Sequence, residues 1–218
     1  TATLVHDDII DNSDLRRGKT TVNVAWSNSH GVLIGDFIYS KAFMLMNEIG
    51  NFKVIDELSS ATNKIAEGEL MQLANKNNLN TSLQQLKKIS YYKTGRLFEA
   101  SAKSAAMLSG KSIPFIENIS KAAKLIGIAF QVRDDLLDYG VSKGNIGKPE
   151  MQDILEDKIT YPLYFALKSS SKKDSLKILK KLKNKDFNLE EVADFVSSSS
   201  AFNKCNSLIQ NYSNEISK

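Results

Sequence analysis

The sequence contains few of the residues that crosslink chains or interrupt helices, with one cysteine, three prolines and 11 glycines among 218 residues. The single cysteine, Cys205, excludes an internal disulfide and is typical of a reducing compartment, so we expect a cytoplasmic protein. Scarce proline and glycine favour long helices over many short strands. No apolar run approaches the length of a membrane span, so we expect none.

Hydrophobic residues make up 42% and charged residues 25% of the chain, which is ordinary for a globular protein. The length suits one domain with a sizeable core. A net charge of +4 is too small to indicate a nucleic-acid partner, although it helps to attract anionic substrates. Much of the positive charge lies between Lys172 and Lys185, where leucines recur at helical spacing, and we interpret this segment as a solvated amphipathic helix.

Apolar residues recur at helical spacing along most of the chain, and no strand-like alternation of useful length is present. The main predicted helices cover residues 1–11, 31–49, 54–74, 81–109 and 115–139. Thr81 and Gln84 resemble a capping box for the fourth of these helices. The second is apolar on most sides, so we expect it to be a central helix in which Asp36 needs a partner. The predicted fold class is all-α.

Between the helices, polar residues and glycines predict loops. Residues 27–30 are expected to form one loop, and 19–26 are ambiguous between a short helix and irregular structure. Residues 140–160 are expected to form a longer loop, of the length that often serves as a functional lid.

The first acidic motif lies near the start of the chain. Asp7 and Asp11 are four residues apart in a predicted helix, so they project from one face although like charges there repel. Carboxylates on one face suit Mg²⁺, which shares itself with substrate phosphates, and the nearby Arg16 and Arg17 suit phosphate. The alternative from these residues alone is a solvated acidic helix end followed by a basic loop.

A second acidic motif repeats this spacing. Asp134, Asp135 and Asp138 match the pattern of Asp7, Asp8 and Asp11 on another, otherwise apolar helix. Two such helices facing each other across a bundle would hold metal ions between them, and a diphosphate bridging those ions would balance the charge. The repeat makes two merely solvated faces the minor alternative.

With these motifs the sequence resembles the head-to-tail trans-prenyl diphosphate synthases, most closely the octaprenyl and related longer-chain enzymes of bacteria. The matching motifs, in order, are His6-Asp7-Asp8-x-x-Asp11 with Arg16-Arg17-Gly18, Gly35-Asp36, Lys93-Thr94, Gln131-x-x-Asp134-Asp135-x-x-Asp138 and Lys158-x-Thr160-x-Pro162. The resemblance covers nearly the whole chain. It implies a single polyprenyl synthase domain over residues 1–218, a bundle of long helices around a central cavity.

The resemblance also implies a reaction. An allylic diphosphate ionises, the double bond of isopentenyl diphosphate attacks the cation, and loss of a proton gives a longer allylic diphosphate. The implied cofactor is Mg²⁺, with Asp7, Asp11 and Asp134 as direct ligands and Asp8 and Asp138 binding less directly or through water. His6 is expected to support these ligands by hydrogen bonding.

The remaining implied roles concern the substrates. Arg16 is expected to contact the allylic diphosphate and Arg17 the isopentenyl diphosphate. Positive charge at the leaving group is expected from Lys93, Lys148 and Lys158. Thr94 and Gln131 are expected to place oxygen dipoles near the developing cation, although Gln131 alternatively satisfies a backbone group in the core. The released pyrophosphate can take the proton, so no side chain need act as general base.

Product length has a geometric determinant. Ala2 and Thr3 lie about one helical turn before Asp7, where a growing chain would extend away from the metals. Their small side chains leave that path open, so we expect a longer product, with a floor formed by larger residues such as Phe37 or Met44.

Two departures from the family pattern accompany the resemblance. The family usually carries glycine where this chain has Met151 and Asp157, which puts the geometry of the loop and the role of Lys148 in doubt. The family's Gly-Lys-Arg segment, which helps to hold isopentenyl diphosphate, precedes the first aspartate motif, and this chain begins after it. We therefore expect that the N-terminal helices are lacking, and activity of the chain as given is left open.

Two other functions are weighed against the synthase. A terpene cyclase shares the first motif but usually mixes Asn, Ser or Thr and Glu in the second, and Arg16-Arg17-Gly18 argues against it. A non-catalytic subunit of a heteromeric synthase tends to lose one motif, whereas both are intact here. By the resemblance we expect a homodimer, to which residues 31–46 contribute an apolar face, and peripheral membrane contact only through the lipid product.

Overall fold

The structure is a computed structural model that describes residues 1–140 and 151–217. The described chain is all-α, as predicted, apart from one short hairpin. It divides into two compact units, unit 1 with residues 1–56 and unit 2 with residues 57–140 and 151–217. Lys148 and the rest of residues 141–150 of the predicted lid lie outside the described residues, and the described remainder is not all loop, because residues 152–155 form a short helix. Among the described helices, none is long and apolar enough to cross a membrane.

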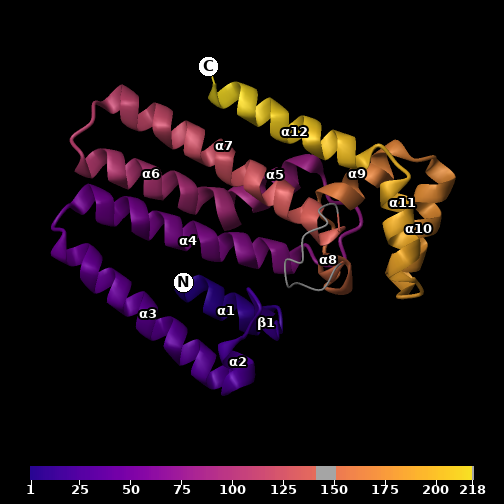
Figure 1. Ribbon diagram of the computed structural model, residues 1–218, viewed down its shortest axis with the longest axis horizontal. Coiled ribbons are helices and arrows are strands. Elements are labelled where there is room, and N and C mark those ends of the chain that lie inside the picture. The colour runs from indigo at the N-terminus through magenta and orange to yellow at the C-terminus, as the bar shows by residue number, and fades with distance from the viewer. Residues whose placement is uncertain (141–150, 218) are drawn as a thin grey trace. The chain divides into compact units, whose positions relative to one another are not determined.

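Unit 1 is built on one long helix. Its elements are α1 (Ala2–Ile10), β1 (Leu15–Arg16), β2 (Lys19–Thr20), α2 (Val22–Ala25), α3 (Asn28–Glu48) and the start of α4 (Phe52–Ala74) (Figure 1). Both α1 and α2 pack against α3. The close approach depends on glycine, because a Cβ on Gly31 would lie 2.6 Å from Ile9 Cδ1 and one on Gly35 would lie 2.1 Å from His6 Nε2.

Two predictions for unit 1 were wrong. Residues 27–30 are not a loop, because Ser27 caps α3 by accepting a hydrogen bond from the backbone N–H of His30 and the helix begins at Asn28. Nor is α3 a central helix among the described residues. Only its two glycines, Gly31 and Gly35, are buried, while Leu33 and Phe37 are more than 60% exposed.

A β-hairpin follows the first acidic motif, and its second strand begins the segment 19–26 that was ambiguous, half of which forms the short helix α2. Leu15 pairs with Thr20 and Arg16 with Lys19. The two turn residues, Arg17 and Gly18, both have positive φ, which is the conformation of a two-residue turn that matches the twist of the strands. Strands this short show no alternation that a sequence pattern can reveal.

Unit 2 is a layered helical body. It continues α4 and adds α5 (Leu83–Ser90), η1 (Tyr91–Gly95), α6 (Arg96–Leu108), α7 (Ile113–Asp138), α8 (Gln152–Leu155), α9 (Tyr161–Ser169), α10 (Lys172–Asn184), α11 (Leu189–Ser197) and α12 (Ala201–Ile216). Helix α7 lies alongside both α6 and α12 (Figure 1). The core of unit 2 includes Val132, Leu136, Tyr161, Leu163 and Cys205, all at most 1% exposed.

The helix predicted over residues 81–109 is continuous but has a different start and an irregular middle. Its N-cap is Ser82, which accepts a hydrogen bond from the Gln85 backbone N–H, and not the predicted Thr81. The buried Thr81 hydroxyl instead bonds the Asn78 carbonyl oxygen and receives a hydrogen bond from Asn75. Between α5 and α6 the chain widens into η1, a π-helical turn of five residues, a feature frequent at functional sites.

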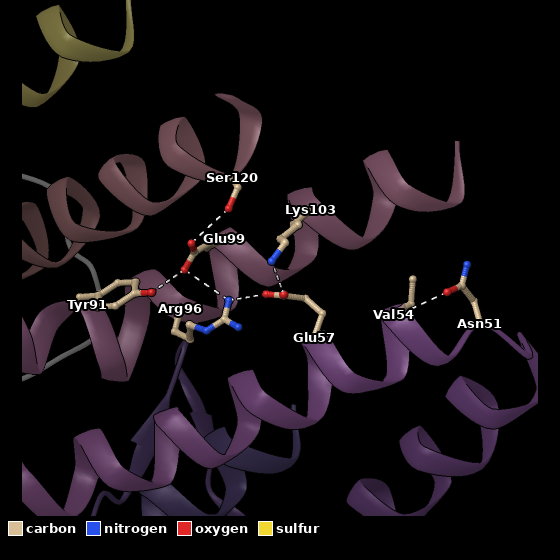
Figure 2. A network of polar contacts seen from close by, with 8 residues as sticks. All are labelled: Asn51, Val54, Glu57, Tyr91, Arg96, Glu99, Lys103 and Ser120. Carbon is tan, nitrogen blue, oxygen red and sulfur yellow. Dashed lines mark hydrogen bonds and ion pairs between the residues drawn. The ribbon is translucent and has the colours of Figure 1, made fainter. Parts of the chain in front are cut away.

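A buried ionic network surrounds this π-helical turn (Figure 2). Arg96 Nη1 donates to Glu57 Oε1 at 2.5 Å and to Glu99 Oε2 at 3.3 Å, and Lys103 Nζ donates to the other Glu57 oxygen at 2.6 Å. Two cations therefore balance two carboxylates from α4 and α6. The neutral donors that complete the network are the Tyr91 hydroxyl, at 2.7 Å from Glu99, and the Ser120 hydroxyl, at 3.1 Å.

Candidate active site

The first acidic motif is positioned within unit 1 by the C-terminal half of α1. Asp7 and Asp11 are both half-buried, and the backbone N–H of Asp11 bonds the Asp7 carbonyl oxygen at 2.8 Å, so α1 ends with its two outer carboxylates one turn apart. Oxygen donors in this arrangement suit a hard cation.

The middle carboxylate of this motif differs from its neighbours. Asp8 is buried and accepts a 2.6 Å hydrogen bond from Arg16 Nε on β1. The hairpin therefore folds Arg16 back onto α1, while Arg17 is exposed in the hairpin turn. Of the two arginines predicted to bind diphosphate, Arg16 is held by the acidic helix and Arg17 lies at the surface.

His6 links the motif to α3. Its Nε2 lies 3.1 Å from the Val32 carbonyl oxygen and 3.3 Å from Asp36 Oδ1. Both neighbours are acceptors, so Nε2 carries the proton. Asp36 thus has the partner that the sequence called for, although it is exposed on α3.

The second acidic motif lies at the end of α7 in unit 2. Asp134 is exposed, and Asp138 is half-buried with its two carboxylate oxygens accepting from the backbone N–H groups of Gln152 and Asp153 at 3.0 and 3.1 Å. The backbone N–H of Met151 bonds the Asp138 carbonyl oxygen at 2.7 Å. Three successive amides therefore converge on Asp138, and its carboxylate is less available than that of Asp134.

The backbone around Asp138 bears on one departure from the family pattern, namely that Met151 and Asp157 stand where the family usually carries glycine. Met151 has φ of 61° and Asp157 has φ of 62°, in the left-handed region that favours glycine. The chain therefore keeps a glycine-like backbone at both positions without glycine. At Met151 the turn is what directs successive N–H groups towards Asp138.

The predicted catalytic residues of unit 2 are joined by hydrogen bonds. The Thr94 hydroxyl donates to Gln131 Oε1 at 2.7 Å, and Gln131 Nε2 donates to Asp135 Oδ1 at 2.8 Å. The other oxygen of Asp135 accepts from the Tyr161 backbone N–H at 3.2 Å. Because Asp135 is an acceptor on both sides, the amide of Gln131 is oriented with its oxygen towards Thr94.

Asp135 was absent from the predicted site residues and is the main residue that sequence reasoning missed. It is buried, and burial together with the nearby Asp134 and Asp138 charges raises its pKa to about 7, although the hydrogen bonds from Gln131 and Tyr161 lower it. The sequence did contain a signal for it, because Asp135 is four residues after Gln131 and residues four apart on a helix share a face.

The two described lysines of the predicted site each have a carboxylate partner. Lys93 Nζ lies 2.9 Å from a Glu69 oxygen and donates to Gln72 Oε1 at 2.8 Å. Lys158 is buried and forms an ion pair with Glu156. Lys93 and Lys158 line one pocket of unit 2 together with Gln131. Glu69 and Gln72, which the sequence analysis did not select, thus belong to the surroundings of Lys93.

The described carboxylates do not form a complete metal site by themselves. Among the described residues, no group of three or more His, Cys, Asp or Glu side chains is arranged to hold a metal ion. Mg²⁺ usually keeps several waters and takes one or two carboxylates plus substrate phosphates. The outer carboxylates Asp7, Asp11 and Asp134 fit that mode of binding, in which protein ligands alone do not complete the coordination.

The all-α fold with an Asp-Asp-x-x-Asp motif on each of two helices defines an isoprenoid synthase fold. The solved structures agree. The decaprenyl diphosphate synthase of Rhodobacter capsulatus matches with a TM-score of 0.91 and 31% identity, over 99% of this chain and 67% of that one. A Caulobacter crescentus polyprenyl synthase, complexed with calcium and isoprenyl diphosphate, matches with a TM-score of 0.92 and 32% identity, over 99% and 66%.

The sequence comparison identifies the family. The polyprenyl synthetase family model matches residues 1–198, and the chain belongs to this family. The octaprenyl diphosphate synthase of Escherichia coli is 44% identical over 167 residues, which are 77% of this chain and 52% of that protein. The all-trans-nonaprenyl-diphosphate synthase of Rhodobacter capsulatus is 37% identical over 94% of this chain and 63% of its own length. The chain thus spans about half the length of the first of these relatives.

Proposed function

We propose that the chain is the catalytic part of a cytoplasmic trans-polyprenyl diphosphate synthase, which condenses isopentenyl diphosphate head-to-tail with an allylic diphosphate. The observation that carries the proposal is the hydrogen-bonded series Thr94, Gln131 and Asp135 directly beside the second acidic motif. It is supported by relatives whose names specify octaprenyl and nonaprenyl products. Single-domain organisation over residues 1–218 is part of the proposal.

The chemical task is to stabilise a departing diphosphate and a carbocation away from water. Asp7, Asp11 and Asp134 would bind Mg²⁺ directly and Asp8 and Asp138 less directly. Mg²⁺ supplies Lewis-acid neutralisation of the leaving diphosphate. The calcium in the Caulobacter crescentus complex supports a divalent cation in this role.

The side chains around the reacting carbon would act by fixed dipoles. Asp135 holds the Gln131 amide, and the amide oxygen accepts the hydrogen bond from the Thr94 hydroxyl, so the lone pairs of that hydroxyl are left to face a developing cation. Lys93 and Lys158 add positive charge for the departing diphosphate. Arg16 would bind the allylic diphosphate and Arg17 the isopentenyl diphosphate, while Lys148 is proposed from the resemblance alone.

Product length is proposed to depend on Ala2 and Thr3. Thr3 is four residues before Asp7 and therefore on the same face of α1, while Ala2 is buried. Tyrosine at either position should shorten the product, and unchanged product length in both variants would contradict this assignment. Phe37 and Met44, proposed as the floor, are exposed on α3 in unit 1.

A homodimer is also proposed. The large apolar side chains that α3 leaves exposed, including Leu33, Phe37 and Leu45, support a face for a second copy. Analytical ultracentrifugation of the protein and of its Phe37→Glu variant tests this, with a monomer expected for the variant only.

The decisive experiment is incubation of the protein with farnesyl diphosphate, radiolabelled isopentenyl diphosphate and Mg²⁺, with product length determined by chromatography. Elongated all-trans products that disappear in the Asp7→Asn and Asp134→Asn variants are expected. A hydrocarbon or alcohol formed from the allylic substrate alone would instead indicate a terpene cyclase. No turnover alone, with altered product in a mixed complex, would indicate a non-catalytic subunit.

A further inference from the structure

The positive charge of the chain is concentrated on one helix. The six lysines and one aspartate of α10 give it a formal charge of +5. The whole chain carries +4, so all other residues together carry −1. If lysine served only to keep the protein soluble, the positive charge would be spread over the whole surface. Its concentration on α10 therefore indicates a role for this helix.

The packing of α10 fixes which face it presents. Ile178 and Leu182 are buried in a core cluster with Leu163 and Ala166 of α9, so the opposite side of the helix is directed outwards. At about 100° per residue, an outward arc of about 140° contains five lysines, one leucine, one asparagine and no acidic residue of α10. In angular order these residues are Lys172, Lys183, Leu176, Lys180, Lys173, Asn184 and Lys177, all of them exposed.

Within residues 1–140 and 151–217, carboxylates from neighbouring elements reach only one edge of this arc. Glu191 of α11 pairs with Lys181 at 2.5 Å and with Lys177 at 3.7 Å. Asp174 lies outside the arc and bonds the capping residue Ser171. The centre of the arc therefore remains strongly basic, and Leu176, 56% exposed, lies within it.

We propose that the basic face of α10, defined as the seven residues of this arc, docks the protein on an anionic phospholipid surface. Lysines around an exposed leucine match such a surface, because long lysine stems lie along apolar material while their ammonium groups contact phosphates. A basic amphipathic helix is typical of membrane-surface binding. The face has no arginine or aromatic side chain, the residues that nucleic-acid sites use for bidentate contacts and stacking. This docking goes beyond the proposed synthase activity and does not depend on it.

Vesicle sedimentation tests the proposal with the protein and two lipid compositions. We expect binding to vesicles of phosphatidylcholine with about 30% phosphatidylglycerol, and none to vesicles of pure phosphatidylcholine. The triple variant Lys173→Glu, Lys180→Glu, Lys183→Glu should bind at least about 100-fold more weakly, since each lysine near an anionic surface is worth about fivefold. The corresponding triple glutamine variant should show a smaller loss.

The matched control replaces three exposed lysines outside α10 by glutamate, namely Lys53, Lys111 and Lys121. It changes the net charge by the same amount and should retain most of the binding. Leu176→Ser should weaken vesicle binding at low and at high salt, whereas the contribution of the lysines disappears at high salt because the charges are screened. Circular dichroism confirms that each variant is folded.

An equal loss of vesicle binding in the triple glutamate variant of α10 and in the control triple variant would overturn the proposal, because net charge alone would then explain binding. Binding to pure phosphatidylcholine at equal strength, or equally tight binding of a short DNA duplex lost in the same variant, would overturn it as well. Turnover of the α10 variant with soluble substrates should stay unchanged, which separates failure of docking from failure of the proposed synthase function.

Discussion

Replacing Arg96 by methionine removes the cation that two buried carboxylates share. The Arg96 side chain is 10% exposed, and its partners Glu57 and Glu99 are 8% and 17% exposed. Breaking a buried ion pair by removing one partner costs about 3–5 kcal/mol. Glu57 keeps Lys103 and Glu99 keeps two neutral donors, so we expect the lower end, about 3 kcal/mol.

Urea unfolding followed by circular dichroism measures this cost. A loss of about 3 kcal/mol should lower the unfolding midpoint by about 1 M or more. Arg133→Met is the control, because Arg133 is exposed on α7 and a surface substitution changes the free energy of unfolding by about 0.5 kcal/mol at most. The double variant Arg96→Met, Glu57→Gln should cost less than the sum of its single variants, by about 1–3 kcal/mol. Strict additivity, or a cost below about 1 kcal/mol for Arg96→Met, would refute the network as a stabilising unit.

The pH dependence provides a second readout. Burial alone raises the pKa of Glu57, but the hydrogen bonds from Lys103 and Arg96 outweigh it, and the pKa lies below its ordinary value. A carboxyl whose pKa is lowered on folding contributes stability above its unfolded pKa, about 4.3, and that contribution is lost as the pH falls through the folded pKa. The deficit of Arg96→Met should therefore narrow as the pH falls through the lowered folded pKa of Glu57, because protonation of Glu57 removes its ion pair with Arg96 from the unchanged protein as well.

Three further predictions concern the site itself. Asp157→Gly should raise the free energy of unfolding by about 0.5–1 kcal/mol in urea titrations, because glycine adopts the positive φ without strain; a loss would show that the aspartate side chain matters more. Glu69→Gln should lower the melting temperature, because Lys93 loses its carboxylate partner. Mg²⁺ with inorganic pyrophosphate should then raise the melting temperature of this variant by more than it raises that of the unchanged protein. Equal increases in the two proteins would contradict the proposed role of Lys93. Gln131→Leu should reduce kcat about 10- to 100-fold with little change in KM, measured by elongation assays, since the neighbouring threonine loses the acceptor for its proton; a change in KM alone would argue for a binding role.

Helices were predictable where local chemistry alone decides them. Ser112 is the N-cap of α7 and Pro114 lies in its first turn, residue types that favour a helix start, and apolar periodicity continues along the helix. Gly50, which has φ of 66°, likewise follows the end of α3. The π-helical turn was not predictable, because its geometry depends on contacts with other helices. A Cβ on Gly127 of α7 would lie 2.5 Å from the Gly95 Cα, and this close crossing has no signal in local sequence.

The candidate site shows the same division. Repeated spacing identified the two acidic motifs, but it could not separate the members of each motif. Burial does so, since Asp8 and Asp135, at equivalent positions, are both 5% exposed, whereas Asp134 is exposed. Burial is decided by the neighbours of α1 and α7. The middle aspartate of each motif is therefore buried and accepts a hydrogen bond from a protein side chain, whereas the outer aspartates are half-buried or exposed.

The pairing of the predicted phosphate-binding cations has a consequence for substrate binding. Arg16 is held by Asp8, Lys93 by Glu69 and Lys158 by Glu156. A cation that already has a carboxylate partner gains less from a phosphate than a solvated one, because the phosphate must compete with that partner. Without metal, the aspartates of either motif would also repel an incoming diphosphate. Affinity for the diphosphate should therefore come from exchange of these carboxylate partners together with a divalent cation, and pyrophosphate should bind measurably only when Mg²⁺ is present. Equal binding of pyrophosphate with and without Mg²⁺ in isothermal titration calorimetry would show that the lysines and arginines alone form the diphosphate site.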